Sequence, residues 1–262
     1  MTNRIVPLKK FGQNYLRDKN IINKIIETFN PEPDNSVVEI GPGTGALTKL
    51  LFDKVKKFTA VEIDKRVIEQ LKNEMTGLNI INEDFLEIDL SKFTGSKNKI
   101  RIIGNIPYNL TSPIIFKLFE NREYIQDAML MVQYEVAQRM TAARQTKDYG
   151  IFSVLLNYFA SAKLCFKISP NVFFPKPKVW SAIVHINFEK EVNNSIEDEL
   201  FIKVVKASFG NRRKTLKNSL SNSIFRNLNF DTMPFNLSRR AEELTIQEFI
   251  ELTQIIKGRL NG

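Results

Sequence analysis

Short apolar runs that end in glycine or in acidic residues alternate, along the first half of this chain, with longer segments of mixed polarity. Ser36–Ile40 stops at a glycine-rich turn, and Phe58–Ile63 stops at acidic residues. Such runs, bounded by turn residues, are typical of strands buried on both faces of a parallel sheet. We expect further strands at residues 78–82, 100–104 and 127–133, and helices that begin near Gly45, Lys65 and Pro113. Strands that alternate with helices predict an α/β fold with a doubly wound sheet.

The pattern changes after Tyr149. A helical segment to about Tyr158 precedes two β-rich runs, Ala162–Ile168 and Ser181–Phe188, which bracket a proline-rich loop. These runs predict an antiparallel edge on a mostly parallel sheet. Residues 190–195 have the composition of a linker, and the pattern from Ile196 onward is helical. We therefore expect an α/β domain over residues 1–190 and a small all-helical domain over residues 195–262.

Composition limits the class of protein. The 262 residues are 43% hydrophobic, and no stretch approaches the roughly 20 apolar residues that span a bilayer. Met1–Arg4 precedes no apolar signal core and Cys165 is the only cysteine, which together predict a cytoplasmic protein without an internal disulfide. A net charge of +9 favours a polyanionic partner, although an excess of solubilising lysine gives the same composition. We see no dimerisation pattern and expect a monomer.

A glycine-rich turn, Gly41-Pro42-Gly43-Thr44-Gly45, follows the first predicted strand. Glycines there let the backbone approach a nucleotide-like ligand where a Cβ atom would clash. The spacing is not the dinucleotide fingerprint, and the lysine of a P-loop is absent. Glu62, at the end of the second strand, is placed to accept two hydrogen bonds from ribose hydroxyls, and Asp84 after the third strand to accept one from an adenine amine. An ordinary strand-to-helix turn with incidental surface acids is the alternative.

The sequence Gly104-Asn105-Ile106-Pro107-Tyr108-Asn109 lies at the carboxyl end of the fourth predicted strand, where open α/β sheets bind ligands. It supplies what methylation of an adenine amine requires. Because the lone pair of that amine is delocalised into the ring, acceptors must hold its hydrogens, and the Asn105 amide oxygen and a main-chain carbonyl near Pro107 suit this role. Tyr108 offers an aromatic face for stacking. A bare turn in which Asn105 satisfies backbone groups is the alternative.

Two further segments carry candidate nucleic-acid contacts. In the loop Phe173–Ser181 one aromatic ring could cover the other face of a base, although one of Phe173 and Phe174 is expected in the core. Between Lys203 and Arg226 there are seven basic residues and no acid. This basic block indicates a surface that contacts phosphates, with a solvated helix face as the alternative. Its candidate RNA-binding residues are Arg212, Arg213, Lys214 and Lys217.

Metal chemistry and histidine chemistry are not indicated. His185, the only histidine, lies in an alternating strand pattern, and neither His185 nor Cys165 belongs to a cluster of ligand residues. We therefore predict no metal site and no histidine base.

Together these motifs resemble the adenine dimethyltransferases of bacterial small-subunit ribosomal RNA, the family associated with kasugamycin sensitivity. Gly12-Gln13-Asn14-Tyr15-Leu16 is similar to that family's G-Q-N-F-L opening, with tyrosine in place of the usual phenylalanine. Asn105–Tyr108 matches its N-[IL]-P-Y motif, and Phe173–Ser181 matches F-x-P-x-P-K-V-x-S. Gln133–Arg139 and Ser208–Leu220 look like the small-subunit enzymes rather than their relatives, with Tyr134 where lysine is usual.

The resemblance implies a Rossmann-like methyltransferase sheet that binds S-adenosyl-L-methionine. The implied cofactor contacts are Asn14, Leu16, Gly41, Gly43, Glu62, Asp84 and Asn105. The implied catalytic residues are Asn105, Pro107, Tyr108 and Phe173, with Phe173 rather than Phe174 as the stacking ring. The implied reaction is dimethylation of the N6 amino group of two adjacent adenosines near the 3′ end of small-subunit (16S) rRNA, within a 30S or pre-30S particle, as a step in ribosome biogenesis.

Other functions share part of this pattern. The large-subunit rRNA methyltransferases of the macrolide-resistance type carry much of it, and an RNA-binding assembly factor could keep methylation as a secondary activity. The intact Asn105–Tyr108 motif argues against a protein that only binds RNA. DNA adenine methylation is disfavoured because its motif is commonly D-P-P-Y.

Overall fold

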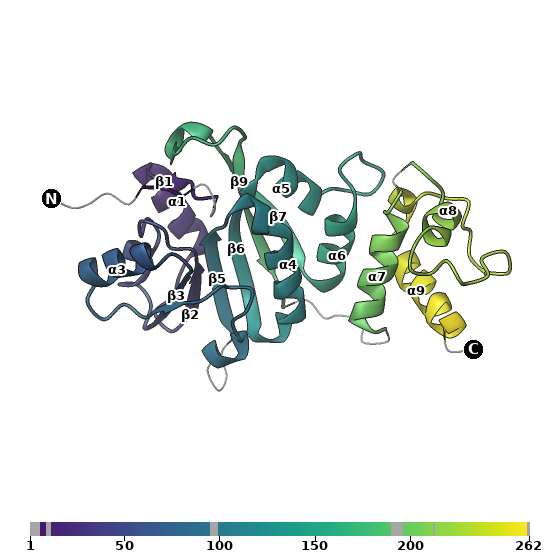
Figure 1. The fold of residues 1–262 in the computed structure, drawn as a ribbon, viewed down its shortest axis with the longest axis horizontal. Coiled ribbons are helices and arrows are strands. Elements are labelled where there is room, and N and C mark those ends of the chain that lie inside the picture. Colours follow the sequence, from purple (N-terminus) through teal and green to yellow (C-terminus); the bar gives the residue numbers. More distant parts are fainter. Residues whose placement is uncertain (1–5, 9–11, 95–98, 190–195, 212, 261–262) are drawn as a thin grey trace. The chain divides into compact units, whose positions relative to one another are not determined.

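The structure, a computed structural model, describes residues 6–8, 12–94, 99–189, 196–211 and 213–260. The chain forms two compact units, drawn as ribbons in Figure 1. One unit comprises Met1–Ala137 and Lys163–Glu189, and the other comprises Gln138–Ala162 and Lys190–Gly262. The expected linker at residues 190–195 and the N-terminal residues 1–4 lie outside the described part of the chain.

A seven-stranded sheet forms the centre of the first unit, with the strand order β4-β3-β2-β5-β6-β9-β7. Its strands are β2 (Ser36–Ile40), β3 (Lys57–Glu62), β4 (Ile80–Asn82), β5 (Ile100–Asn105), β6 (Ile125–Gln133), β7 (Ser161–Ile168) and β9 (Ser181–Asn187). The strands that the apolar runs predict are thus confirmed, with ends that shift by one or two residues.

The sheet is mostly parallel, with an antiparallel edge. β2 pairs in parallel with β3 and β5, β3 with β4, and β5 with β6. β9 runs antiparallel to β6, with Ser181 opposite Gln133, and β7 lies beyond β9 at the edge. The strand order reverses between β2 and β5, and the crevice at such a switch point is where an open α/β sheet binds ligands.

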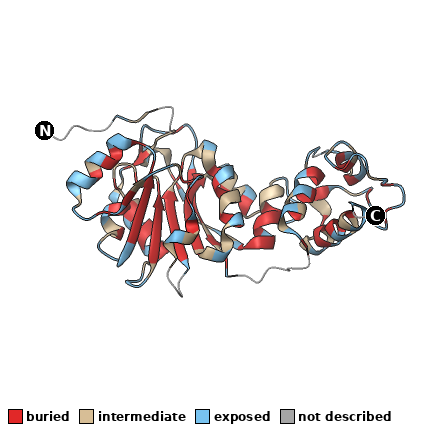
Figure 2. Cartoon of the chain, turned by 60° about the horizontal axis from the view of Figure 1, so that its bottom comes forward, coloured by how far each residue is buried: buried red, intermediate tan, exposed pale blue. Residues whose placement is uncertain are grey.

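Three helices of this unit begin close to the predicted positions, namely α2 (Thr48–Leu51), α3 (Lys65–Glu74) and α4 (Thr111–Glu120). The sequence pattern does not predict α1 (Lys19–Phe29) or α5 (Tyr134–Met140), the latter of which continues into the second unit. The Asp18 carboxylate caps α1 by accepting from the N–H groups of Asn20 and Ile21. Phe29 of α1 and Leu71 of α3 are buried in one apolar cluster with strand residues. Figure 2 shows that the strands of the sheet consist mainly of buried residues.

A small two-stranded sheet joins β1 (Tyr15–Leu16) to β8 (Phe173–Phe174) in antiparallel register. Tyr15 lies opposite Phe174, and Leu16 lies opposite Phe173. The pairing brings the segment Gly12–Leu16 beside the proline-rich loop, although the two segments are far apart in the sequence.

The second unit is built from helices, as the pattern after Ile196 predicts. Its helices are α6 (Ile151–Phe159), α7 (Asp198–Ser208), α8 (Leu216–Ser221) and α9 (Ile246–Leu260). It includes Gln138–Ala162, which the sequence boundary at residue 190 assigns to the first domain. Tyr149 shows why, because its hydroxyl donates to the Leu244 carbonyl at 3.2 Å and its ring makes an edge contact with Phe209.

None of the helices within the described ranges is both long and apolar enough to cross a membrane.

His185 takes part in a polar cluster at the amino-terminal ends of β5 and β6. Arg101 donates from Nε and a terminal nitrogen to the two carboxylate oxygens of Asp127, each at 2.8 Å. His185 Nε2 lies 2.7 Å from Asp127 Oδ2. Burial alone would raise the pKa of Asp127, but the hydrogen bonds from His185 and Arg101 outweigh it and lower this pKa. The cluster also fastens α1, because Arg101 donates to the carbonyls of Phe29 and Asn30.

Candidate active site

The glycine-rich turn after β2 lines a cavity of about 230 Å3 in the first unit. Gly41 and Gly43 have φ angles of 64° and 54°, in the left-handed region that favours glycine. A Cβ atom on Gly43 would lie 3.0 Å from two ring carbons of Tyr15, whereas one on Gly41 would meet no protein atom within 4 Å. The turn therefore packs closely at Gly43 and leaves open space at Gly41.

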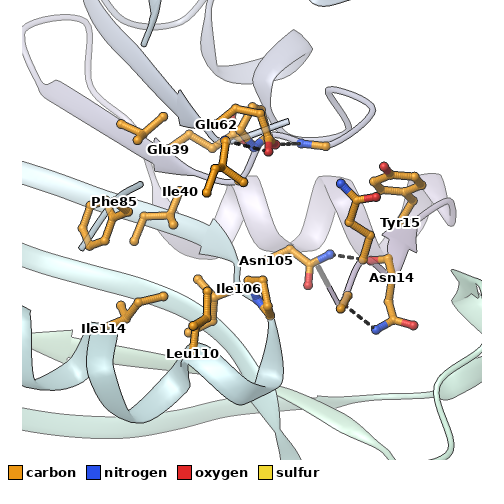
Figure 3. A pocket seen from close by; sticks show the side chains of 18 of the residues that line it. Asn14, Tyr15, Glu39, Ile40, Glu62, Phe85, Asn105, Ile106, Leu110 and Ile114 are labelled. Carbon is orange, nitrogen blue, oxygen red and sulfur yellow. Dashed lines mark hydrogen bonds between the residues drawn. The ribbon is translucent and has the colours of Figure 1, made fainter. Parts of the chain in front are cut away.

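Glu62, at the end of β3, is only 6% exposed. Its Oε1 accepts from the N–H groups of Ile63 and Asp64, each at 2.9 Å, and its Oε2 accepts from Gly43 at 3.4 Å. Burial raises the pKa of Glu62, and these N–H donors partly offset the rise. Because each carboxylate oxygen has two lone pairs, Oε2 keeps capacity to accept from a ligand hydroxyl. Glu62 thus lies at the end of its strand, as the sequence predicts, and its carboxylate contacts the glycine-rich turn (Figure 3). Its contact with a ribose stays a prediction.

A second buried carboxylate, Glu39, lines the same cavity and was not foreseen from the sequence. Thr48 Oγ1 donates to Glu39 Oε2 at 2.7 Å. Burial raises the pKa of Glu39 to about 8 despite this hydrogen bond, and Glu62 contributes to the rise. The raised pKa favours the protonated form of Glu39, because a second buried negative charge beside Glu62 would be costly. Its position two residues before Gly41 was the available signal.

Asn105 and Asn14 meet at the polar end of the cavity. The Asn105 amide nitrogen donates to the Asn14 carbonyl at 2.8 Å, and the Asn14 amide nitrogen donates to the Gly12 carbonyl at 3.2 Å. Figure 3 shows both contacts. This bond fixes the orientation of the Asn105 amide, whose oxygen is its accepting atom and has no hydrogen-bond donor among the described residues. Leu16, which is buried, also lines the cavity.

After Asn105 the backbone turns through Pro107 into a short 3-10 helix, Tyr108–Leu110. The Pro107 carbonyl accepts from Leu110 N at 2.9 Å. The Tyr108 hydroxyl lies 2.7 Å from Ser181 Oγ at the start of β9, and burial raises the pKa of Tyr108. This bond fixes the ring at its hydroxyl end while the residue lines the cavity. The sequence shows Ser181 only as part of a loop motif, because the contact joins segments that are distant along the chain.

The opposite end of the cavity is apolar. Ile40, Phe85 and Ile114 gather there in Figure 3. Asp84 also lines the cavity, and its Oδ1 accepts from Leu86 N at 2.9 Å. A flat heteroaromatic group would meet apolar walls and a carboxylate at this end. Phe85 and Ile114 were not singled out from the sequence, because single apolar residues are equally typical of a core.

The two phenylalanines of the proline-rich loop occupy different environments. Phe173 is 5% exposed and belongs to the apolar core, whereas Phe174 is 46% exposed and has the Arg17 guanidinium carbon 3.9 Å from its ring centroid. Neither ring is among the residues that line the cavity. The core position expected for one of the pair is thus taken by Phe173, the ring that the resemblance assigns to stacking. That stacking role stays a prediction, and it requires Phe173 to leave its packed position.

The basic block belongs to the second unit. Arg213, Lys214 and Lys217 are exposed, and Arg212 lies outside the described residues. Lys217 Nζ forms a salt bridge of 2.5 Å with Asp231, an acid beyond the acid-free stretch of sequence. For Arg213 and Lys214 no ion pair is found within the described part of the chain. Contact of this block with RNA stays a prediction.

Nearly the whole chain matches known proteins. Residues 8–257 match the family model described as ribosomal RNA adenine dimethylase. The chain is similar to a ribosomal RNA small subunit methyltransferase A of Chlorobium phaeobacteroides, with 43% identity over 251 residues that cover 95% of this chain and 91% of the relative. A protein of the same name from Francisella tularensis is 41% identical, over 95% of this chain and 97% of the relative.

Two solved structures share the fold. A dimethyladenosine transferase from Plasmodium falciparum superposes with a TM-score of 0.78 at 25% identity and covers 93% of this chain and 98% of its own. The 23S rRNA methyltransferase ErmE superposes with a TM-score of 0.65 at 26% identity and covers 93% of this chain and 99% of its own.

Proposed function

Because this chain belongs to the ribosomal RNA adenine dimethylase family, we propose that it dimethylates the N6 amino groups of two adjacent adenosines near the 3′ end of small-subunit (16S) rRNA. It is a ribosomal RNA adenine dimethyltransferase with a Rossmann-like sheet. The observation that carries the proposal is the Asn105 side chain, whose nitrogen donates to the Asn14 carbonyl and whose amide oxygen, oriented by that bond, is available to accept from an amine.

The choice of the small subunit rests on the relatives. Proteins named small subunit methyltransferase A are 43% and 41% identical to this chain, whereas the 23S rRNA methyltransferase is 26% identical. A particle of the 30S or pre-30S type is the substrate we propose, and such a reaction belongs to ribosome biogenesis in the cytoplasm. The exposed Arg213 and Lys214 are suited to contact its phosphates.

S-adenosyl-L-methionine, when bound, supplies a methyl group that its sulfonium already activates. The residues present fit this cofactor. We assign Glu62 Oε2 to ribose hydroxyls, because it is the carboxylate oxygen with acceptor capacity left. Asp84 and the apolar end with Phe85 suit an adenine ring. The open space at Gly41 leaves room beside the turn, and Gly43, Asn14 and Leu16 close the same cavity.

Asn105 and the backbone beside it orient the target amine. The Pro107 carbonyl already accepts one hydrogen bond, from Leu110 N. We therefore assign the neighbouring Ile106 carbonyl as the second acceptor, with the Asn105 amide oxygen as the first. Two acceptors hold the amine hydrogens and aim its lone pair along the line of transfer, a gain that comes from orientation. They also stabilise the amine as it becomes cationic, so no base with a tuned pKa is required. Tyr108, held by Ser181, supplies a face for stacking.

The test compares Asn105→Ala with Tyr108→Phe in a methylation assay with labelled cofactor. Under-methylated small subunits, intact large subunits and naked rRNA serve as substrates. We expect Asn105→Ala to lose nearly all transfer and Tyr108→Phe to keep most of it, because stacking uses the ring and not the hydroxyl. Near-normal turnover of folded Asn105→Ala at saturating cofactor would exclude the catalytic role. Methylation of large subunits alone would exclude the small-subunit assignment.

A further inference from the structure

Three side chains of the first unit form a basic and aromatic surface that the reaction described above does not use. Lys167 of β7 places its Nζ 4.3 Å from the ring centroid of Tyr134 and 4.3 Å from that of Trp180. The Tyr134 N–H donates to the Trp180 carbonyl at 2.9 Å, which fixes the backbones of the two aromatic residues to each other. We call Tyr134, Lys167 and Trp180 the indole platform.

The indole platform contains apolar side-chain surface that packing in the folded chain leaves exposed to solvent. Trp180 is 47% exposed, and Val179 beside it is 41% exposed. Lys167 is also exposed, and within the described ranges it has no carboxylate within salt-bridge distance. Burying an indole of this size gains more than burying most side chains. Its exposure therefore indicates a surface that is covered when a ligand binds.

The composition of the platform matches an unpaired nucleotide. Proteins hold single-stranded RNA by stacking bases on aromatic rings and by placing cations near the backbone. Here the indole offers the stacking face and Lys167 offers the charge, with exposed Lys176 and Lys178 on the adjoining loop. Tyr134 stands where the resembling family usually has lysine. A positive charge is still present beside this position, because Lys167 of β7 lies over the Tyr134 ring.

The platform adjoins the candidate active site. Trp180 directly precedes Ser181, whose hydroxyl is bonded to that of Tyr108 in the cavity wall. Tyr134 directly follows Gln133, the residue paired with Ser181 across β6 and β9. Trp180 and Tyr134 thus each lie one residue along the chain from the Ser181–Gln133 pair, at the end of the sheet where Ser181 bonds to Tyr108.

We propose that the indole platform binds an unpaired nucleotide that flanks the target adenosine, with its base stacked on Trp180 and its phosphate held by Lys167. The inference rests on the proposed function, because it takes rRNA as the substrate. Trp180 acts as a substrate-binding residue and takes no part in methyl transfer.

Steady-state methylation of under-methylated small subunits tests the platform. Trp180→Ala should raise KM for the particle roughly tenfold, in line with the loss of one stacked base. The value of kcat and the affinity for S-adenosylmethionine should stay within twofold, because an interaction made equally in the ground and transition states affects KM alone. Trp180→Phe should restore most of the loss. A Trp180→Ala enzyme with an unchanged KM, or with a rise that phenylalanine does not rescue, overturns the proposal.

The lysine has a matched control on its own strand. Lys163 and Lys167 are both exposed on β7, and only Lys167 contacts the two rings. Lys167→Gln should raise KM and reduce its dependence on salt, whereas Lys163→Gln should change neither. Equal effects of the two variants would mean that only overall charge matters, and would overturn the role of Lys167.

Fluorescence gives a readout that does not depend on catalysis. Trp180 is the only tryptophan in the chain, so its emission reports on this surface alone. Binding of an unmethylated RNA oligonucleotide with two adjacent unpaired adenosines, followed independently by anisotropy of a label on the RNA, should quench the emission. RNA that binds without quenching overturns the platform and leaves the proposed function intact. Wild-type protein that methylates no rRNA substrate overturns both.

Discussion

At the scale of single residues, the hydroxyl group of Tyr15 lowers the stability of the folded chain, whereas its aromatic ring packs normally. Its hydroxyl is buried and has no hydrogen-bond partner among the described residues. Burial, followed by the charges of Asp64 and Glu62, raises the pKa of Tyr15 to about 12. The hydroxyl is thus a buried donor left unsatisfied, which costs about 1–3 kcal/mol.

Tyr15→Phe should therefore stabilise the protein by about 1 kcal/mol or more, since it removes the unsatisfied group and keeps the ring packed on Gly43. Chemical denaturation followed by circular dichroism measures the change. Calorimetry should show unchanged affinity for S-adenosylmethionine. A loss of stability would mean that the hydroxyl has a partner in solution.

Glu62 should be needed for cofactor affinity. Glu62→Ala should weaken binding of S-adenosylmethionine by about 1.5–3 kcal/mol, as expected for hydrogen bonds to a charged acceptor. Because Glu62 also accepts from three backbone N–H groups, circular dichroism must first show that the variant folds. Glu62→Gln, which keeps one carbonyl oxygen, should have intermediate affinity. Unchanged affinity in folded Glu62→Ala protein would remove this residue from the site.

The sequence predicts most of these residues because the chemistry of each is visible locally. Glu62 ends a strand, and Asn105 starts a turn with a fixed order of residue types. The sequence alone did not rank Phe173 against Phe174, because two adjacent phenylalanines fit either face of a strand. Pairing with Leu16, a residue far along the chain, places Phe173 in the core. The link from Tyr108 to Ser181 is hidden for the same reason.

At the scale of elements, the start of α9 is held by a reciprocal cap. Glu248 N donates to Thr245 Oγ1 at 3.2 Å, and Thr245 N donates to Glu248 Oε2 at 2.7 Å. Arg239 also bonds to the Glu248 carboxylate. The hydrogen bond from Arg239 lowers the pKa of Glu248 to about 2, against the effect of burial.

Glu248→Gln should destabilise the protein at neutral pH by about 1 kcal/mol. The pKa of Glu248 is lower in the folded chain than its ordinary 4.5, so its contribution is fully present above pH 4.5 and is lost as the pH falls towards 2. The difference in melting temperature between wild type and Glu248→Gln should therefore shrink across this range. Glu251→Gln, at an exposed position on the same helix, is the control and should show no such trend. A constant difference at all pH values would contradict the assignment.

Elements were predictable where periodicity is local. The central strands β2, β3, β5 and β6 have five or more residues that are mainly apolar and buried, and turn residues bound them, whereas β7 alternates polar and apolar residues. β1 and β8 have two residues each, too few for any period, and they exist only because they pair with each other. Helix α1 begins after an N-cap residue, Asp18. It does not follow one of the predicted strands, so the alternation of strands and helices does not indicate it.

At the scale of the whole molecule, local pattern indicates two domains but not the membership of Gln138–Ala162. Residues 151–159 fit a helix equally well in either domain. The contact between Tyr149 and Leu244 decides the question, because it joins this segment to the C-terminal helices. Long-range contacts of this kind are set by the folded chain and leave no trace in local periodicity.

The two units should also separate in function. Replacing the basic block by glutamine should weaken binding to under-methylated small subunits. It should also flatten the plot of log binding constant against log salt concentration, by about one unit of slope for each phosphate that the variant no longer neutralises. The four residues are Arg212, Arg213, Lys214 and Lys217. Cofactor affinity should not change, because the cavity lies in the first unit. Affinity measured across a salt series, beside calorimetry with S-adenosylmethionine, separates the two effects.

The control for this variant removes the same charge elsewhere. A second variant replaces four exposed lysines of the first unit by glutamine, so its net charge equals that of the block variant. The four lysines are Lys54, Lys57, Lys65 and Lys72. If only long-range attraction matters, both variants should bind with the same reduced affinity. If the block contacts phosphates, its variant should bind more weakly and with a flatter slope. Within the block, Lys217→Gln should cost less than Arg213→Gln, because Lys217 must first give up its salt bridge with Asp231 to bind a phosphate. Equal slopes for the wild type and both variants would mean that the block is a solvated face, and that the RNA surface lies elsewhere.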